Sequence, residues 1–461
     1  MKKILLIVFC NLCVTAAFAQ DKCGAQMLKE SIIAHHPDFA TELDRIQAVQ
    51  SAQAAALKKA KLYGVAEKTT STGTVPIIFH IVLNAAQIAQ LGGIEGIQER
   101  ADSQVAVLNR DYNAGNGDAY LIPSAFKPVY GNVGITFGLA RLTPTGDCTS
   151  GFEIDTTTAP GFDYNGTAGS QQGFSNAKYS STGGADIWDS STYLNVWVIN
   201  PTSPSGILGL TVPLSYIGGA SGFSSAEEGV ILNYGSFGVK SPNVQYFLNG
   251  AAGGRTLTHE IGHFFEIWHT WGDDNGACPW DPSGKDDGIA DTPPEGTSHS
   301  GSYNMPLPTV TDNCSDSASG IMYMNFMDYP DDPYALLFTQ EQALQMQSNI
   351  IPGGESYSLT THPAVLIGQG CPNLAVAKVS TMHTFSISPN PTTGSVHINT
   401  GNGAQLQNIN VLNILGQVVK TIIPSANASI YTIDMAGMQK GLYFVQCYFK
   451  DGMVSGKIIL Q

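Results

Sequence analysis

Three histidines and a glutamate stand close together in the stretch THEIGHFFEIWHTWGDD, residues 258–274. His259 and His263 are four positions apart, so on a helix they lie one turn apart on the same face and both can bind one metal ion. Glu260 follows the first histidine, where it can hold a water molecule beside the ion and accept its proton. His269 offers a third nitrogen ligand. The spacing therefore predicts a catalytic metal site.

The pattern His-Glu-x-x-His is typical of zinc peptidases. A catalytic zinc ion takes three protein ligands and keeps one position open for water, which three histidines would satisfy. Bound zinc lowers the pKa of water to about 7 and polarises a carbonyl group, and Glu260 is then the expected general base and proton donor. The alternative is a set of surface histidines on an amphipathic helix. With only 10 histidines in the chain, this pattern rarely arises by chance.

Glu266 stands where the longer motif His-Glu-x-x-His-x-x-Gly-x-x-His has glycine. Glycine there lets the helix end in a left-handed residue, so that the chain turns and the third histidine returns to the ion. A glutamate in that conformation costs about 1 kcal/mol, which metal coordination can offset. On an unbroken helix Glu266 would lie about 10 Å along the axis from His259, too far to share one ion. We therefore expect His269 as the ligand and a strained or supporting Glu266.

The elements around the motif mix strands with long helices. Apolar runs predict strands at residues 75–83, 133–142, 193–200 and 229–234. A helix is predicted over residues 94–112, because its apolar residues share one face: Ile94, Ile97, Ala101, Val105 and Leu108. Residues 339–350 begin with a Thr-x-x-Gln capping signature and predict another helix. The expected fold is an α/β or α+β catalytic domain over residues 74–352.

The N-terminus predicts export. Residues 1–19 combine a basic start (Lys2 and Lys3), an apolar run and the pattern Ala-Phe-Ala ending at Ala19, which is typical of a cleaved signal peptide. The alternative, a membrane anchor, needs about 20 apolar residues. No later segment of the sequence is apolar enough to span a bilayer.

Further segments flank the catalytic domain. Residues 20–73 predict a helical, alanine-rich propeptide, with apolar residues at near-helical spacing: Phe39, Leu43, Ile46, Val49 and Leu57. Residues 353–383 read as a linker. Residues 384–461 alternate short strands with Gly, Asn and Pro turns, which predicts a small immunoglobulin-like β-sandwich.

Charge and length narrow the function. A chain of 461 residues is too long for one ordinary domain. It carries 37 Asp and Glu against 22 Lys and Arg, a net charge of −15, and this argues against nucleic-acid binding, which needs a basic face. Export to an oxidising compartment would permit disulfides among the cysteines that remain after the signal peptide is removed.

Further motifs make residues 74–350 resemble the pappalysin (cytophagalysin-type) branch of the metzincin metallopeptidases. They are HEIGHFFEIWHTWGDD, DDGIADTPP, MYMNFMDYPDD and LFT. The resemblance implies a twisted mixed sheet, an active-site helix and a Met-turn, with Met327 as an apolar floor beneath the histidines. It also implies that Tyr329 stabilises the tetrahedral intermediate. The alternative is that both residues are ordinary core side chains.

The same resemblance implies a structural calcium ion in the loop after the third histidine. Asp287, Asp291 and Thr292 are its expected ligands, and their hard oxygen atoms suit calcium. An aspartate-rich loop that is merely solvated is the alternative.

Disulfide bonding is also suggested by the resemblance. Family members commonly have two disulfides here, but Pro333 replaces one of the cysteines, so only Cys278–Cys314 is expected. Cys148 and Cys371 are a further possible pair, which spacing alone leaves open.

Two residues bear on specificity and latency. Relatives that prefer arginine after the cut carry an acidic residue at the position of Asp332, whose charge would favour Arg or Lys in the S1′ pocket.

The stretch KCGA around Cys23 resembles the cysteine switch of metzincin propeptides, in which a thiolate on zinc keeps the enzyme latent. The alternative is an unpaired cysteine in a removable segment.

The C-terminal region resembles the sorting domain of cargo for the type IX secretion system. The motifs are SPNPTTG, LGQVV and GLYFV, although the usual basic residue at the extreme end is missing. A carbohydrate- or protein-binding β-sandwich is the alternative.

We therefore predict a secreted, monomeric zinc endopeptidase made as a latent zymogen. It would act on proteins or peptides, with zinc and also calcium as cofactors, and the secretion machinery would recognise its C-terminal domain. One alternative is an impaired, metal-stabilised extracellular binding or adhesion protein, against which the intact Glu260 argues. Another is a hydrolase of a non-peptide substrate, against which the latency cysteine argues.

Overall fold

The computed structural model describes residues 22–461 apart from 63–72, 166–171, 205, 274–275, 282–286, 317, 368–370, 372–385, 400–405, 414–417, 425–429 and 450–451. The predicted signal peptide, residues 1–19, lies outside the described residues. The chain divides into two compact units, residues 1–369 and 370–461, which are described separately.

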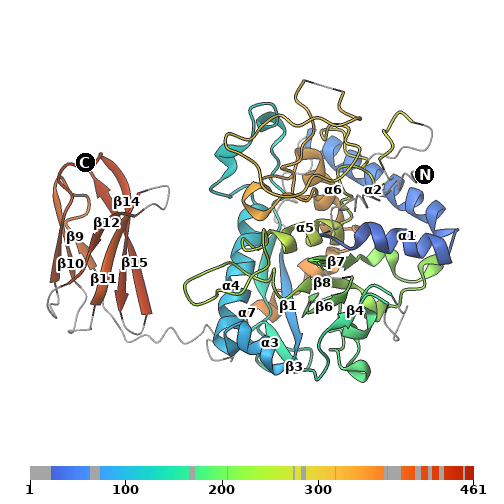
Figure 1. Cartoon of the computed structure of the whole chain (residues 1–461), viewed down its shortest axis with the longest axis horizontal. Helices are drawn as coiled ribbons and strands as arrows, with labels where there is room; N and C mark the ends of the chain where they lie inside the picture. The colour runs from blue at the N-terminus through green and yellow to red at the C-terminus, as the bar shows by residue number, and fades with distance from the viewer. Residues whose placement is uncertain are drawn as a thin grey trace, which may run out of the picture. The chain divides into compact units, whose positions relative to one another are not determined.

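A mixed sheet forms the centre of the first unit (Figure 1). Its strands are β1 (Thr74–Leu83), β2 (Thr136–Leu139), β3 (Phe152–Thr156), β5 (Leu194–Ile199), β7 (Gly209–Val212) and β8 (Gly229–Asn233). The order is β2-β1-β5-β8-β7, and β3 pairs with β1 beyond the end of β2. The pairs are parallel except that β7 runs antiparallel to β8. This mixed sheet confirms the predicted fold class.

Several helices surround this sheet, and one of them, α5 (Arg255–Phe264), carries the first two histidines of the motif. These helices are α3 (Ala85–Gln90), α4 (Gly93–Asp111), α5, α6 (Gln340–Ile350) and α7 (Ala364–Ile367). Helix α5 packs against α4, β7 and β8. The predicted capping box at α6 is present, with Thr339 and Gln342 bonding reciprocally. Helix α4 buries Ile97, Ala101 and Leu108, but Ile94 is 67% exposed. The predicted helix is therefore confirmed, and Ile94 is exposed because it lies in the first turn of α4.

The predicted propeptide is helical, as expected. Helices α1 (Ala25–His35) and α2 (Phe39–Leu62) are drawn in dark blue in Figure 1. Leu28 and Ile32 of α1 belong to the same buried cluster as Leu210 of β7, and α2 packs against α6. Val49 of α2 is exposed instead of buried, because the face of α2 that meets the domain is narrower than the apolar pattern implied.

Short elements complete the first unit. Strands β4 (Phe162–Asp163) and β6 (Pro201–Ser203) form a separate parallel pair. The 3-10 helices are η1 (Ala119–Leu121), η2 (Lys127–Val129), η3 (Ser175–Lys178), η4 (Ser180–Thr182), η5 (Leu214–Tyr216), η6 (Gly219–Ser221), η7 (Ser225–Glu227), η8 (Asp332–Tyr334) and η9 (Tyr357–Thr360).

The second unit consists of two antiparallel sheets with a shared core. Its strands are β9 (Ser386–Ser388), β10 (Ser395–Asn399), β11 (Leu406–Leu412), β12 (Val418–Ile422), β13 (Ile430–Asp434), β14 (Gly441–Phe449) and β15 (Gly452–Leu460). One sheet has the order β13-β10-β9 and the other β12-β11-β14-β15. Ile398 of the first sheet and Val445 of the second belong to one buried cluster. This arrangement confirms the predicted β-sandwich.

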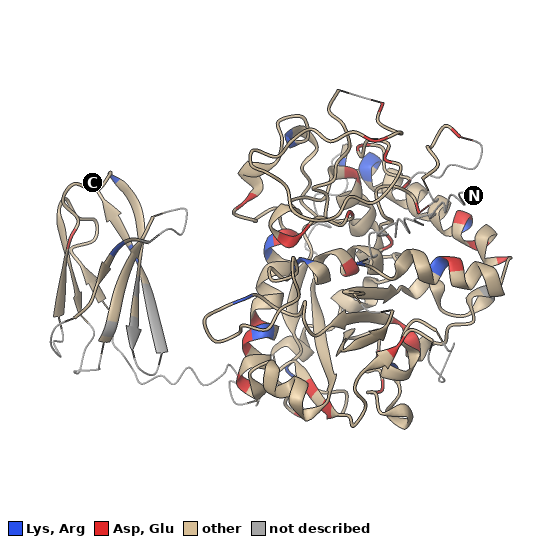
Figure 2. Cartoon of the chain, in the orientation of Figure 1, with Lys and Arg blue, Asp and Glu red and all other residues tan. Residues whose placement is uncertain are grey.

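Charged residues are sparse over the described ribbon. In Figure 2 lysines and arginines are scattered among acidic residues rather than gathered along one element. Within the described part of the chain, every helix is too short or too polar to cross a bilayer.

Candidate active site

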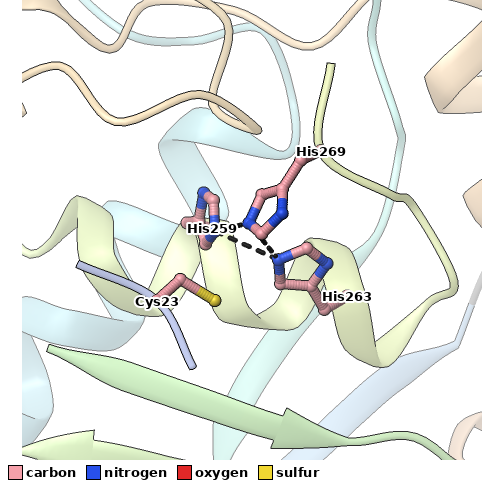
Figure 3. Close-up of side chains that lie close together, drawn as sticks. All are labelled: Cys23, His259, His263 and His269. Atoms are coloured by element: carbon pink, nitrogen blue, oxygen red, sulfur yellow. Dashed lines mark hydrogen bonds between the residues drawn. The ribbon is translucent and has the colours of Figure 1, made fainter. Parts of the chain in front are cut away.

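The three histidines of the motif converge at one point (Figure 3). His259 and His263 project from α5, and His269 comes from the chain that follows it. Their Nε2 atoms are 3.1 Å apart for His259 and His263, 3.0 Å for His263 and His269, and 3.3 Å for His259 and His269. Each Nδ1 atom has its own acceptor: the carbonyl of Phe326 at 2.7 Å, the carbonyl of Ile267 at 2.7 Å and the carboxylate of Asp273 at 2.6 Å, respectively.

This cluster fits a zinc ion. Since each Nδ1 faces an acceptor, the proton resides there, and the three Nε2 atoms present lone pairs to one another. Burial, reinforced by His269, lowers the pKa of His259 to about 3, and burial holds the pKa of His263 well below its usual range. Three Nε2 lone pairs so close repel one another unless a cation lies between them. Tetrahedral zinc–nitrogen bonds of about 2.1 Å require nitrogens about 3.4 Å apart, close to the observed spacing.

The chain reverses at Glu266, as the sequence predicted. Its φ is +67°, and its N–H donates to the carbonyl of His263 at 2.9 Å. The next N–H, that of Ile267, donates to the carbonyl of Gly262 at 2.9 Å, so the helix closes with a left-handed cap. The carbonyl of Ile267 then accepts the bond from His263 Nδ1. The turn therefore both ends α5 and supports a histidine.

The strain at Glu266 gives a testable prediction. Because a non-glycine residue in this conformation is penalised, we expect Glu266→Gly to be more stable than Glu266→Ala by about 1 kcal/mol, or about 2–4 °C in melting temperature. Both variants lose the buried carboxyl group, so the difference between their stabilities isolates the cost of the left-handed backbone conformation. Thermal unfolding and zinc content would be measured together. Equal stability of the two variants would show that the conformation carries no such cost.

Glu260 is held against the edge strand β7. Thr211 Oγ1 donates to Glu260 Oε2 at 2.8 Å and to the Glu260 carbonyl at 2.9 Å. Glu260 is fully buried, and burial raises its pKa to about 8 despite the opposing effects of Thr211 and Cys23. Any side chain at Gly209 would collide with the carboxyl group. A glycine on β7 therefore leaves room for the carboxyl group of Glu260.

The turn containing Met327 lies beneath the histidines. A Cβ atom at Gly262 of α5 would collide with Met327 Sδ, so the methionine packs directly under the helix. The hydroxyl of Tyr329 lies 3.2 Å from His269 Nε2 and 3.4 Å from the carbonyl of Cys23. The structure therefore brings both residues to the histidine cluster.

Cys23 closes the cluster from the N-terminal segment. Its sulfur and the ligand atoms of the three histidines all lie within 4.8 Å of one another, and Figure 3 shows the side chain beside α5. The backbone pairs with β7: Gly24 N–H donates to the Gly209 carbonyl at 2.9 Å, and Leu208 N–H donates to the Lys22 carbonyl at 2.7 Å. Burial, and then Glu260, raises the pKa of Cys23, so a thiolate here needs a cation beside it.

Charged residues of both signs line a neighbouring pocket of about 500 Å³: Asp118, Asp331 and Asp332 beside Arg110 and Arg255. Asp332 Oδ2 accepts the Gly253 N–H at 2.6 Å, and burial raises the pKa of Asp332 to about 6. The adjacent Asp331 instead pairs with Lys22, whose Nζ lies 2.7 Å from Asp331 Oδ1, and accepts from Ser302 at 2.7 Å. Sequence analysis did not single out Asp331 or Lys22.

The expected calcium ligands are only partly together. Thr292 Oγ1 donates to Asp287 Oδ2 at 2.9 Å. Asp291 Oδ2 instead accepts the N–H of Glu341 at 3.0 Å, at the start of α6.

A disulfide joins Cys278 to Cys314, which are 36 residues apart. Cys148 and Cys371 are disulfide-bonded as well. Cys447 is a free, buried cysteine of the second unit.

Comparisons with known proteins agree with this geometry. Residues 178–351 match the family model described as "Pregnancy-associated plasma protein-A", and residues 386–461 match the one described as "Secretion system C-terminal sorting domain". An extracellular metalloprotease of Arthroderma gypseum is 30% identical over 155 residues, 33% of this chain and 46% of that protein. One of Colletotrichum graminicola is 37% identical over 95 residues, 21% of this chain and 30% of that protein. The aligned region thus spans less than half of these relatives.

Solved structures match over a larger part. A mutant of promirolysin from Tannerella forsythia is 28% identical, with a TM-score of 0.59, and the match covers 75% of this chain and 99% of that one. Mature mirolysin of the same organism with a cleaved peptide is 32% identical, with a TM-score of 0.52, covering 64% and 98%.

The mixed sheet, the histidine helix and the Met-turn define the metzincin class of metallopeptidases. Within that class, the chain belongs to the pappalysin family. The C-terminal unit is a sorting domain for type IX secretion, so the protein is exported.

Proposed function

We propose that this protein is a secreted zinc endopeptidase that is made as a latent zymogen. The observation that carries the proposal is the convergence of three histidine Nε2 atoms at 3.0–3.3 Å, with Glu260 on the same helix and the sulfur of Cys23 beside the cluster. The matched metalloproteases and the promirolysin structure support it.

His259, His263 and His269 would hold the zinc, which when bound polarises the scissile carbonyl and acidifies water. Glu260 accepts the proton of the attacking water and passes it to the leaving amine. Its buried position and raised pKa suit a group that must take up a proton and release it. The hydroxyl of Tyr329 is placed to donate a hydrogen bond to the developing oxyanion.

The edge of β7 would bind the peptide backbone. The Leu208 N–H and the Gly209 carbonyl, which pair with Lys22 and Gly24 in the zymogen, become available once the propeptide leaves. An extended peptide can then add to this edge as a strand. The carboxylates of Asp331 and Asp332, in a pocket that Arg110 and Arg255 also line, would favour Lys or Arg in the substrate, as the pairing of Lys22 with Asp331 illustrates.

The chain would consist of five segments, which are removed or used at successive stages of export and activation. We assign residues 1–19 as signal peptide, 20–73 as propeptide, 74–352 as peptidase domain, 353–383 as linker and 384–461 as sorting domain. The protein would be a monomer whose partners are its substrates and the secretion machinery. Calcium would bind at Asp287, Asp291 and Thr292, of which Asp287 and Thr292 lie side by side.

Removing the metal tests the activity. We expect ortho-phenanthroline to abolish cleavage of a mixed peptide library by the matured chain, and stoichiometric zinc to restore it. The non-chelating meta isomer is the matched control. The cut sites report specificity, with Lys or Arg expected after the cut. Cleavage that survives complete removal of zinc would refute the proposal, and so would the absence of cleavage by a zinc-loaded chain whose propeptide has been removed.

A further inference from the structure

A second group of metal-binding side chains lies outside the histidine site. Glu295, His299 and Asp328 each offer a ligand atom, and these atoms all lie within 4.8 Å of one another. Glu295 and His299 belong to the long chain segment between α5 and the Met-turn. Asp328 stands between Met327 and Tyr329 in the turn itself. The sequence analysis singled out none of the three.

The two carboxylates of this group are deeply buried and each has one unpaired oxygen. Glu295 is 1% exposed and Asp328 is 3% exposed. Glu295 Oε1 lies 2.8 Å from His299 Nδ1, and Asp328 Oδ1 accepts the N–H groups of His299 at 2.8 Å and Tyr329 at 2.7 Å. Glu295 Oε2 and Asp328 Oδ2 have no hydrogen-bond donor among the described residues, and the two carboxyl groups lie close enough to share a proton. Buried carboxylate oxygens normally have a donor, because leaving them bare is costly.

The charge at this point is only partly balanced. In the described part of the chain, no lysine or arginine forms an ion pair with Glu295 or Asp328. Burial lowers the pKa of His299, but its bond to Glu295 outweighs this and the pKa is raised, so a protonated imidazole offsets one carboxylate at most. Burial and then the charge of Glu295 raise the pKa of Asp328 well above its usual range. Two facing carboxylates therefore need either a shared proton or a cation between them.

We propose that Glu295, His299 and Asp328 form a second metal site, for a divalent transition ion such as zinc or manganese. Two buried carboxylates supply the negative charge that such an ion neutralises. An imidazole ligand favours a transition ion over calcium, which takes oxygen ligands. The bare oxygens, Glu295 Oε2 and Asp328 Oδ2, are the atoms that the ion would satisfy.

An ion here would brace the catalytic turn. Asp328 Oδ1 already accepts the N–H of His299 at 2.8 Å, and the N–H of Asp331 donates to the Gly301 carbonyl at 2.9 Å. Binding at Glu295 and His299 would add a third tie between the two chain segments. The site would therefore be structural and would support the position of Tyr329 without touching the substrate.

Metal content tests this site independently of peptidase activity. The full-length chain would carry His259→Ala, His263→Ala and His269→Ala, which remove the three histidine ligands of the first site. After chelation and reloading with zinc or manganese, elemental analysis should find about one equivalent in this parent, and adding Glu295→Gln should remove it. The control is Glu153→Gln, since Glu153 also contacts a histidine, His80, but belongs to no such three-residue group.

A folded parent that binds no zinc or manganese would overturn the proposal in favour of a shared proton. An equivalent that survives Glu295→Gln, or binding of calcium alone, would overturn it as well. Should Glu295→Gln fail to fold, His299→Ala replaces it, because His299 is less buried. Zinc should also raise the melting temperature of the parent by about 5 °C, and no rise would count against the site.

Discussion

Replacing Glu260 by glutamine in the matured chain is expected to lower peptide cleavage by about a thousandfold while the bound zinc stays in place. Glutamine keeps the shape of the side chain and can still meet Thr211, but it cannot accept a proton. Because burial raises the pKa of Glu260 to about 8, the folded state tolerates a neutral group there. The melting temperature should therefore be unchanged or higher.

The measurement is kcat/KM on a fluorogenic peptide, with zinc content and thermal unfolding on the same preparation. The matched control is Glu227→Gln, a buried carboxyl remote from the motif that forms a capping box with Ser224. Glu260→Gln that retained activity would remove the glutamate from the mechanism. Loss of zinc together with activity would instead make Glu260 a structural support.

Replacing Cys23 by alanine should release the latency of the zymogen. The thiol is tethered at the histidine cluster, so its effective concentration is high, and its removal should raise cleavage by the unprocessed chain roughly tenfold or more. The release would be partial, since Lys22 still pairs with Asp331 and Gly24 still bonds to Gly209. Adding Lys22→Ala should therefore raise the activity further.

Initial rates would be measured on a small peptide, with mass spectrometry to show that the propeptide is still attached. Cys447→Ala is the matched control, because Cys447 is also free and buried but lies in the second unit. Unchanged latency in Cys23→Ala would show that the thiol does not block the site, and that the backbone pairing of residues 22–24 and the Lys22–Asp331 ion pair do. Activation by Cys447→Ala would point to a general effect of losing a thiol.

The sequence predicted the central strands well for a physical reason. Strands β1, β5 and β8 are buried on both faces of a parallel sheet, so they are continuous apolar runs that stand out from the loops. Strand β7, with the sequence GLTV, is short and begins with glycine, and it becomes recognisable only through its pairing with β8. The exposed Ile94 and Val49 show that apolar periodicity identifies the apolar side of a helix, but not how many residues of that side are buried against the domain.

The residues of the candidate site also fall into two groups, those that local sequence predicts and those that it does not. The three histidines could be found because they lie within one helix and the turn that follows it, where spacing along the chain fixes spacing in space. The left-handed Glu266 followed from the same local geometry. Thr211, Asp331 and Lys22 could not be found, because tertiary packing brings them together from segments far apart in the sequence. Their roles depend on the fold, which local patterns do not encode.

The most direct test is a crystal structure of the zinc-loaded zymogen with data collected at the zinc absorption edge. We predict an anomalous peak about 2.1 Å from each of the three Nε2 atoms and about 2.3 Å from the sulfur of Cys23. After removal of the propeptide, the peak should remain on the histidines and lose the sulfur. A histidine cluster without zinc in the zinc-loaded protein, or zinc there without Cys23, would contradict the claim that one metal site serves both latency and catalysis.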